Sequence, residues 1–175
     1  MSLPIRGGDP DADASPRCSI LARKDQIVAR LREVLPASAV ISDLSETRAY
    51  ECDALTAYRC PPLCAVLPAS TEEVSAVLKI CHEEGVPVVP RALRHIARRR
   101  RIATADSVIL GVAKMNRVLE TDYANRFIRV QTGRTNLSVS GAVAEEEFFY
   151  APDPSSQLAC AIAGNIAMNS GGAHC

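Results

Sequence analysis

The chain has 175 residues, enough for a single domain that buries roughly two-thirds of the surface its unfolded form would expose. Its 20 basic and 20 acidic residues cancel, so the overall charge gives no support for binding to nucleic acid or to an anionic membrane. Apolar residues make up 47% of the chain, aromatic residues make up only 4% and Trp is absent, so we expect a core of Val, Leu, Ile and Ala in an α/β domain.

The seven cysteines are scattered and odd in number, and Cys60 and Cys64 are the closest pair. This spacing is not that of a disulfide framework or of a zinc site, so we expect no metal and a reducing compartment. The N-terminal stretch lacks an apolar core of signal-peptide length, and no later run approaches the ~18 apolar residues of a membrane span. These features predict a soluble, cytoplasmic protein without a transmembrane segment.

The N-terminal 20 residues show no pattern of regular structure. They are rich in Gly, Pro and Asp, so we expect a disordered tail over residues 1–20 and a domain over residues 21–175. In residues 24–35 the apolar side chains recur at the spacing of one helix face, which predicts an amphipathic helix. Pro36 should end this helix, because proline cannot continue its hydrogen-bond ladder.

A strand–helix–strand unit is predicted next. The apolar run 63–67 predicts a buried strand, and residues 86–89 predict a second one. Between them, Ser70 and Glu73 have the spacing of a capping box, which places the start of a helix at Ser70. Gly85 should end that helix. The residues expected on its buried face are Val74, Val77, Leu78 and Cys81.

Two parallel strands joined by a helix form a right-handed unit, and ligands bind beyond the carboxyl ends of such strands. The second strand ends at Pro90 and Arg91, so we expect these residues and those that follow to contact a ligand. Further along the chain, the pattern predicts strands at 107–112 and 126–131, a helix at 135–146 and a short strand at 148–150.

The last quarter of the chain is the most informative. Pro152 and Pro154 fix the path of the backbone, and the glycines that follow allow backbone N–H groups to come close to an anion. Hydroxyl and amide side chains cluster in the same stretch, at Ser155, Ser156, Asn165, Asn169 and Ser170. This composition predicts a surface that cradles phosphate and binds a nucleotide-like group.

Three motifs carry a resemblance to a known family. Residues 150–174 contain Pro-Asp-Pro-Ser-Ser-Gln, then Gly-Asn, then Asn-Ser-Gly-Gly-Ala-His, and two further matching stretches lie at 50–68 and 114–133. In this order and spacing, they resemble the PCMH-type FAD-binding domain of the vanillyl-alcohol-oxidase-like FAD-linked oxidases. The similarity is greatest to the flavin subunits of bacterial glycolate oxidases, within the FAD-linked 2-hydroxyacid oxidases and dehydrogenases. Ala163 departs from the family pattern, which has a glycine there.

The resemblance implies an α+β (α/β) fold, in which a small parallel strand–helix–strand subdomain precedes the start of a second α+β subdomain. It implies FAD as cofactor and oxidation of a small 2-hydroxy acid, such as glycolate or lactate, to the 2-keto acid. It also implies an iron–sulfur electron-transfer subunit as partner. The implied location is the cytoplasm, where such partner subunits would hold the protein at the periphery of the inner membrane. The family's substrate-binding cap follows the region matched here, so we expect a truncated domain and name no catalytic residue.

The resemblance and the loop chemistry together assign a set of residues to the cofactor. They lie at the end of the second predicted strand and in the polar C-terminal stretch. The set is Pro90, Arg91, Pro152, Asp153, Pro154, Ser155, Ser156, Cys160, Gly164, Asn165, Asn169, Gly171, Gly172 and His174.

One segment does not fit the family. After the strand that ends at Arg91, the family has a glycine-rich loop whose backbone amides hold the FAD pyrophosphate. Here no glycine occurs between Arg91 and Gly111, and six of the eleven residues 91–101 are arginine. When GC-rich codons for this segment are read one nucleotide over, they can encode the missing loop. We therefore hypothesise a compensated pair of frameshifts.

Two alternatives remain for the same segment, a diverged basic turn and a patch that binds phosphate or nucleic acid. If the sequence is correct as written, side chains at every position keep the backbone away from a pyrophosphate, so FAD binding should be weak or absent. The alternative function is then that of a truncated, non-functional remnant.

Overall fold

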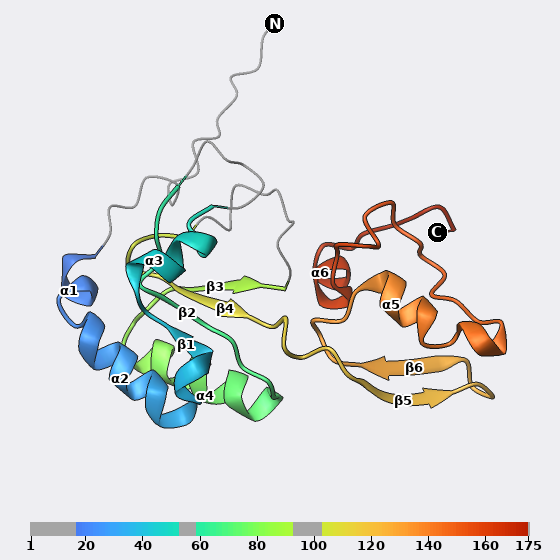
Figure 1. Cartoon of the computed structure of the whole chain (residues 1–175), viewed down its shortest axis with the longest axis horizontal. Helices are drawn as coiled ribbons and strands as arrows, with labels where there is room; N and C mark the ends of the chain where they lie inside the picture. Colours follow the sequence, from blue (N-terminus) through green and yellow to red (C-terminus); the bar gives the residue numbers. More distant parts are fainter. Residues whose placement is uncertain (1–16, 53–58, 93–102, 175) are drawn as a thin grey trace, which may run out of the picture.

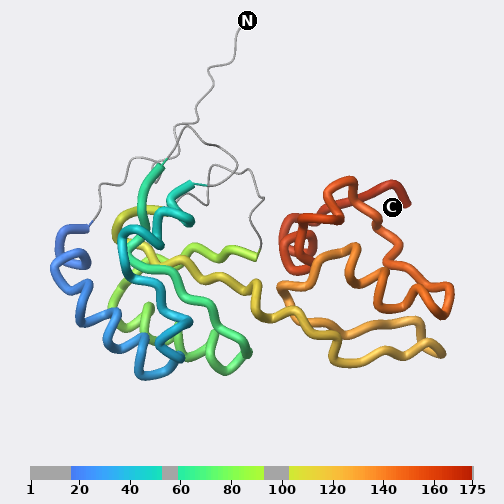
Figure 2. The backbone as a smooth tube through the Cα atoms, in the orientation of Figure 1, coloured from blue at the N-terminus to red at the C-terminus, as the bar shows by residue number. Residues whose placement is uncertain are grey.

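The computed structural model describes residues 17–52, 59–92 and 103–174. These residues form two lobes that follow one another along the chain (Figures 1 and 2). The N-terminal lobe runs to Val112 and contains a four-stranded sheet, whereas the C-terminal lobe, residues 113–174, contains a two-stranded sheet. The result is a mixed α/β fold with a mainly parallel sheet, as the sequence predicted.

The sheet of the N-terminal lobe has the strand order β1-β2-β4-β3. Strand β4 is parallel to both of its neighbours, while β1 is antiparallel to β2. The strands are β1 (Val40–Ile41), β2 (Cys64–Val66), β3 (Val88–Arg91) and β4 (Val108–Gly111). The two predicted strands of the strand–helix–strand unit are therefore parallel but not adjacent, because β4 lies between them.

Helices cover both faces of this sheet (Figure 1). The larger apolar cluster joins β2 and β4 to α2 (Lys24–Val34) and α4 (Thr71–Glu83), which lie side by side. A smaller cluster on the other face contains Ala65 and Ile109, with Tyr50 packed against it. Side chains along β2 and β4 alternate between these clusters, as the period of a strand requires. The remaining helical elements are α1 (Cys18–Leu21), η1 (Ala37–Ala39), α3 (Leu44–Thr47) and η2 (Arg48–Tyr50).

The helices predicted in this lobe are confirmed. Helix α2 ends just before Pro36, and Ile27 and Leu31 on its inner face are fully buried. At α4, the Ser70 hydroxyl accepts a hydrogen bond from the Glu73 N–H at 3.2 Å, and the Glu73 carboxylate accepts one from the Ala69 N–H at 2.7 Å. Both bonds satisfy donors at the helix start that would otherwise lack partners.

Some details of this lobe differ from the prediction, which did not include α1, β1 or α3. Leu78 is not on the buried face of α4, because the sheet and α2 contact the turns that carry Val77, Ile80 and Cys81. Strand β3 starts at Val88 instead of residue 86, because Gly85, at φ +67°, and the buried Val86 still belong to the turn after α4. Helix α1 includes residue 20, where we expected the tail to end, and Ile20 belongs to the larger apolar cluster. Residues 1–16 lie outside the described residues.

A charged cluster ties α1 and α2 to the end of α4. The Glu84 side chain is almost buried and pairs with Arg23 and, at 2.5 Å, with Arg30. The hydrogen bond from Arg30 is the main reason that the pKa of Glu84 lies below its ordinary value, and the positive charge of Arg23 adds to it. Two thiols lie in the core of this lobe, and burial raises the pKa of Cys64 to about 12 and that of Cys81 to about 11. Both therefore stay protonated and unreactive at neutral pH.

The C-terminal lobe consists of an antiparallel hairpin and two short helices. They are β5 (Val118–Asp122), β6 (Phe127–Val130), α5 (Asn136–Gly141) and α6 (Ile162–Ala167), with a 3-10 turn η3 (Ala144–Glu146) between the helices. Helix α6 lies on the side of this lobe that faces the N-terminal lobe (Figure 1). In both lobes, no helix of the described residues is long and apolar enough to cross a membrane.

The prediction is less accurate in this lobe. It missed β5 and α6, and the helix expected at 135–146 ends at Gly141. Residues 148–150 form no strand, because Glu147 adopts a left-handed φ of +61° that turns the chain. The Tyr150 N–H then donates to the Ser140 hydroxyl instead of to a neighbouring strand. Strands β4 and β6 lie within the predicted ranges 107–112 and 126–131, which confirms both.

Candidate functional site

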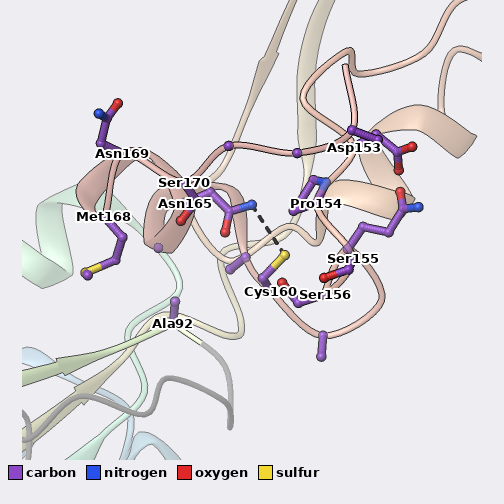
Figure 3. Close-up of a pocket in the computed structure, with 17 residues that line it drawn as sticks. Ala92, Asp153, Pro154, Ser155, Ser156, Cys160, Asn165, Met168, Asn169 and Ser170 are labelled. Atoms are coloured by element: carbon purple, nitrogen blue, oxygen red, sulfur yellow. Dashed lines mark hydrogen bonds between the residues drawn. The ribbon is translucent and has the colours of Figure 1, made fainter. Parts of the chain in front are cut away.

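A polar pocket occupies the C-terminal lobe where it faces the N-terminal lobe (Figure 3). Its volume is about 990 Å³, at the upper end of the range for sites that hold cofactors. Residues 153–173 form nearly all of its wall, and Ala92, which follows β3, is its contribution from the N-terminal lobe. The predicted cofactor residues that line it are Asp153, Pro154, Ser155, Ser156, Cys160, Gly164, Asn165, Asn169, Gly171 and Gly172.

Backbone hydrogen bonds hold the two halves of the wall against α5. In residues 154–160 the chain closes on itself, with the Gln157 N–H donating to the Pro154 carbonyl and the Cys160 N–H donating to the Ser156 carbonyl. The Leu137 N–H, in the first turn of α5, donates to the Gln157 carbonyl at 3.1 Å. These bonds fix the loop by its backbone and leave hydroxyl and amide side chains on the wall of the pocket.

The start of α6 is pinned in the same way. Ala161 forms a bridge with Thr135, and the Ile162 N–H donates to the Arg134 carbonyl at 2.8 Å. Within the wall, the Asn165 side-chain amide is buried and donates to the Cys160 sulfur at 3.3 Å (Figure 3). The backbone carbonyl of Asn165 accepts a hydrogen bond from the Ser170 N–H. Asn165 therefore connects the loop before α6 to the turn after it.

A second junction joins residues 152–153 to residues 172–174. A Cβ atom on Gly172 would lie 1.5 Å from the Pro152 carbonyl oxygen, so only glycine can occupy this position. The neighbouring Ala173 N–H donates to the Asp153 carbonyl at 3.2 Å, and the His174 Nε2 lies 3.6 Å from the Asp153 carboxylate. The His174 ring also packs edge-on against Phe149, at 5.8 Å between centroids. Pro152 and His174 do not line the pocket themselves, but their contacts join the two stretches of chain that do.

Two residues of the wall have left-handed backbone conformations. Asp153 has φ +42° and Asn169 has φ +49°, and both are among the residues that line the pocket. Asn and Asp tolerate this region better than other side chains, although it still costs energy relative to the usual conformations. Such strain is common where a loop is shaped to follow a ligand.

The residues predicted at the end of β3 are not part of the pocket wall. The Arg91 guanidinium donates to the Cys52 carbonyl and lies 5.8 Å from the centre of the Tyr50 ring. Pro90 is exposed on the outer strand of the sheet. The arginine-rich segment begins directly after Ala92, and its residues 93–102 lie outside the described residues. The frameshift and nucleic-acid hypotheses therefore rest on the sequence alone.

Several wall residues were not assigned from the sequence. Gln157 belongs to the motif that starts at Pro152, and Ser170 was grouped with the polar cluster, so both had a signal. The others are Ala92, Ala159, Ala161, Met168 and Ala173, whose side chains carry no polar group that could have indicated a site. The four alanines contribute by their small size, which leaves room for a ligand, while Met168 adds an apolar surface.

Asp153 is the one wall residue of the described pocket with a full charge. An anionic ligand would therefore depend on hydroxyl, amide and backbone N–H donors and not on cationic side chains. The described residues also contain no group of His, Cys, Asp and Glu that could hold a metal ion. The site is thus suited to an uncharged polar molecule, or to a phosphate group held by neutral donors.

A family model described as an FAD binding domain matches residues 62–175. The chain belongs to this family. Glycolate oxidase subunit GlcD of Escherichia coli (strain K12) is 41% identical to it over 171 residues, which cover 98% of this chain and 32% of that protein. D-lactate dehydrogenase of Anaerostipes hadrus is 28% identical over 84% of this chain and 31% of its own length. The chain thus spans about a third of the length of these relatives.

Solved structures share the fold of this chain. Alkyldihydroxyacetonephosphate synthase superposes on 91% of the chain and 33% of its own, with a TM-score of 0.76 and 18% sequence identity. Proteins of the family bind FAD, and the described pocket fits such a group in volume and in its supply of neutral hydrogen-bond donors. Small residues dominate the wall, so the backbone can approach a large planar or phosphorylated ligand.

Proposed function

We propose that this chain forms the FAD-holding part of an FAD-linked oxidoreductase. We further propose that the complete enzyme oxidises a small 2-hydroxy acid, of the glycolate or lactate type, to the 2-keto acid. The polar pocket of the C-terminal lobe carries the first proposal, because it combines room for a dinucleotide with neutral donors on two pinned loops. The names of the relatives, a glycolate oxidase subunit and a D-lactate dehydrogenase, support the second.

Each part of the pocket has a proposed role. The hydroxyls of Ser155 and Ser156 and the backbone of Gly171 donate to the cofactor, while Asn165 and Asn169 shape the turn beside it. Pro152 and His174 hold the second junction closed. Pro90 and Arg91 would bring the segment after β3 to the cofactor. Bound FAD would supply the hydride acceptor, and the described residues would orient it and exclude water.

Flavin content tests the first proposal. The chain is purified as written and, in parallel, with residues 93–100 replaced by Ser-Gly-Thr-Ser-Leu-Ala-Gly-Gly, the loop obtained in the shifted frame. We expect the replaced chain to bind FAD at least about tenfold more tightly, because glycines let backbone amides reach the pyrophosphate. Flavin fluorescence quenching measures the affinity, and resequencing codons 85–110 tests the frameshift itself.

A matched pair of glycine variants identifies the site. Gly172→Ala places a methyl group against the Pro152 carbonyl and should abolish FAD binding by the replaced chain, whereas Gly141→Ala has open space and should leave it unchanged. If the replaced chain melts cooperatively but binds no flavin, the FAD proposal is wrong and the chain is a non-functional remnant. Equal effects of the two variants would place the flavin elsewhere.

The complete enzyme should pass its electrons to an iron–sulfur subunit, in the cytoplasm or at the inner face of the membrane. The relative from E. coli is itself named as a subunit, which supports a multi-subunit assembly. Co-purification of the full-length protein with a polypeptide that shows iron–sulfur absorbance is the expected result. Purification as a single polypeptide that reduces a soluble acceptor at full rate would contradict it.

A further inference from the structure

The buried polar atoms without a hydrogen-bond partner gather at one place in the C-terminal lobe. Among the described residues, they are the Nε of Arg134 and both polar atoms of the Asn136 amide, Nδ2 and Oδ1. The rest of the Arg134 guanidinium is paired, since it donates to the carbonyls of Asn116 and Ser138. Asn136 is only 1% exposed, so its whole amide is buried without a partner.

The helix gives no local reason for an amide at this position. An Asn at the start of a helix usually caps it by accepting from a backbone N–H. Here the cap is Thr135, whose hydroxyl accepts from the Ser138 N–H at 3.2 Å. Asn136 follows the cap as the first residue of α5, so its side chain is not used for capping.

A second buried amide of the same lobe shows the usual arrangement. Gln131 is 9% exposed, and its Oε1 accepts from the backbone N–H of Arg117 at 3.0 Å. Nearly all buried amides are paired in this way, because an unpaired one costs free energy in the folded state. Groups that break such a rule are found mainly at functional sites.

The backbone around Asn136 is bonded to the wall of the polar pocket. The Asn136 N–H donates to the Cys160 carbonyl at 3.2 Å, and the next N–H, of Leu137, donates to the Gln157 carbonyl at 3.1 Å. Cys160 and Gln157 both line the pocket, whereas Asn136 does not. A shift of the loop 154–160 on ligand binding would therefore change the surroundings of the Asn136 amide.

We propose that Asn136 is a positioning residue for the cofactor. Its amide gains hydrogen-bond partners on the loop 154–160 when FAD fills the pocket, and it then holds this loop against the cofactor. The inference rests on the function proposed above. It means that the same amide lowers the stability of the free chain and raises its affinity for FAD.

Asn136→Leu tests the first consequence, because leucine keeps the approximate shape of the side chain and removes its polar atoms. In the free chain as written, we expect the Tm to rise by about 2–4 °C, since an unpaired amide is lost. Gln131→Met is the matched control and should lower the Tm, because the Arg117 N–H loses its acceptor. Circular dichroism on heating measures both. A lower Tm with Asn136→Leu would show that the amide is already paired in the free chain, which would overturn the inference.

The affinity for FAD tests the second consequence, in the chain with residues 93–100 replaced. We expect Asn136→Leu to weaken binding about tenfold and Gln131→Met to change it by less than about twofold. A purely structural role of Asn136 would instead move stability and affinity in the same direction. Unchanged affinity with Asn136→Leu would overturn the inference and leave the FAD proposal intact. If the replaced chain binds no FAD before any change at Asn136, the FAD proposal fails and the inference fails with it.

Discussion

The two lobes bury their apolar residues in different ways. In the N-terminal lobe, a mainly parallel sheet is covered on both faces, and side chains such as Leu31 and Ile109 are shielded from water. In the C-terminal lobe, backbone hydrogen bonds and a glycine contact fix the loops, while Phe149 and Leu158 remain exposed. The first lobe thus holds its shape by apolar packing, whereas the second holds its loops by backbone hydrogen bonds and leaves apolar side chains on its surface.

The largest expected difference concerns two leucines in helices. Leu31→Ala removes a fully buried side chain of α2, so we expect a loss of about 2–5 kcal/mol in the free energy of unfolding. Leu137→Ala changes an exposed side chain of α5 and should cost less than about 1 kcal/mol. Urea denaturation followed by circular dichroism measures both. Similar losses would show that the C-terminal lobe has a closed core after all.

An intermediate effect is expected from the charged cluster. The lowered pKa of Glu84 means that the folded state binds its proton less readily than the unfolded chain does, so the pairing stabilises at neutral pH. This stability is lost as the pH falls below about 4.3, the ordinary value for Glu, and through the folded-state pKa. Glu84→Gln should therefore lower the urea midpoint at pH 7 and reduce its dependence on pH in the acid range.

Asp122→Asn is the counterpart in the C-terminal lobe. Hydrogen bonds from the Asn125 backbone and side chain lower the pKa of Asp122, so its contribution has the same sign. Its contacts are confined to the hairpin turn, and we expect the urea midpoint to change less than with Glu84→Gln. A larger change with Asp122→Asn would mean that the hairpin, and not the charged cluster, controls the acid sensitivity of the chain.

The smallest expected effect comes from two helix caps. Ser70→Ala removes the acceptor for the Glu73 N–H and should cost about 1 kcal/mol in global stability. Thr135→Ala removes the equivalent acceptor for Ser138 in α5. There we expect faster hydrogen exchange at Ser138 with little change in the urea midpoint, because that lobe opens locally. Equal shifts of the midpoint would show that the two lobes unfold as one unit.

The sequence predicted the N-terminal lobe well because its signals are redundant there. The apolar spacing of α2, the capping residues of α4 and the turn at Gly85 all agree with the final packing. The location of β4 between β2 and β3 could not be predicted, since strand order depends on contacts between distant parts of the chain. Helix α6 was missed because its sequence, with Gly164 and Asn165, has a composition typical of a loop.

The candidate site was predicted from the chemistry of its loops. The prediction rested on the hydroxyl, amide and glycine residues of the C-terminal stretch and on the family resemblance, and ten of its fourteen residues line the pocket. His174 is not among the residues that line the pocket; it lies 3.6 Å from the Asp153 carboxylate and packs against Phe149. The hydrogen bond from Arg91 to the Cys52 carbonyl could not be predicted, because it joins residues far apart in the sequence.

The strand order β1-β2-β4-β3 also has a consequence for synthesis on the ribosome. Strand β4, one of the two inner strands, is the last of the four to be made, and both parallel pairings of the sheet depend on it. The nascent N-terminal lobe therefore cannot close its sheet until residue 111 has left the exit tunnel. Until then β2 and β3 expose unpaired edges, so this interval is when the growing chain is most open to aggregation and to chaperone binding.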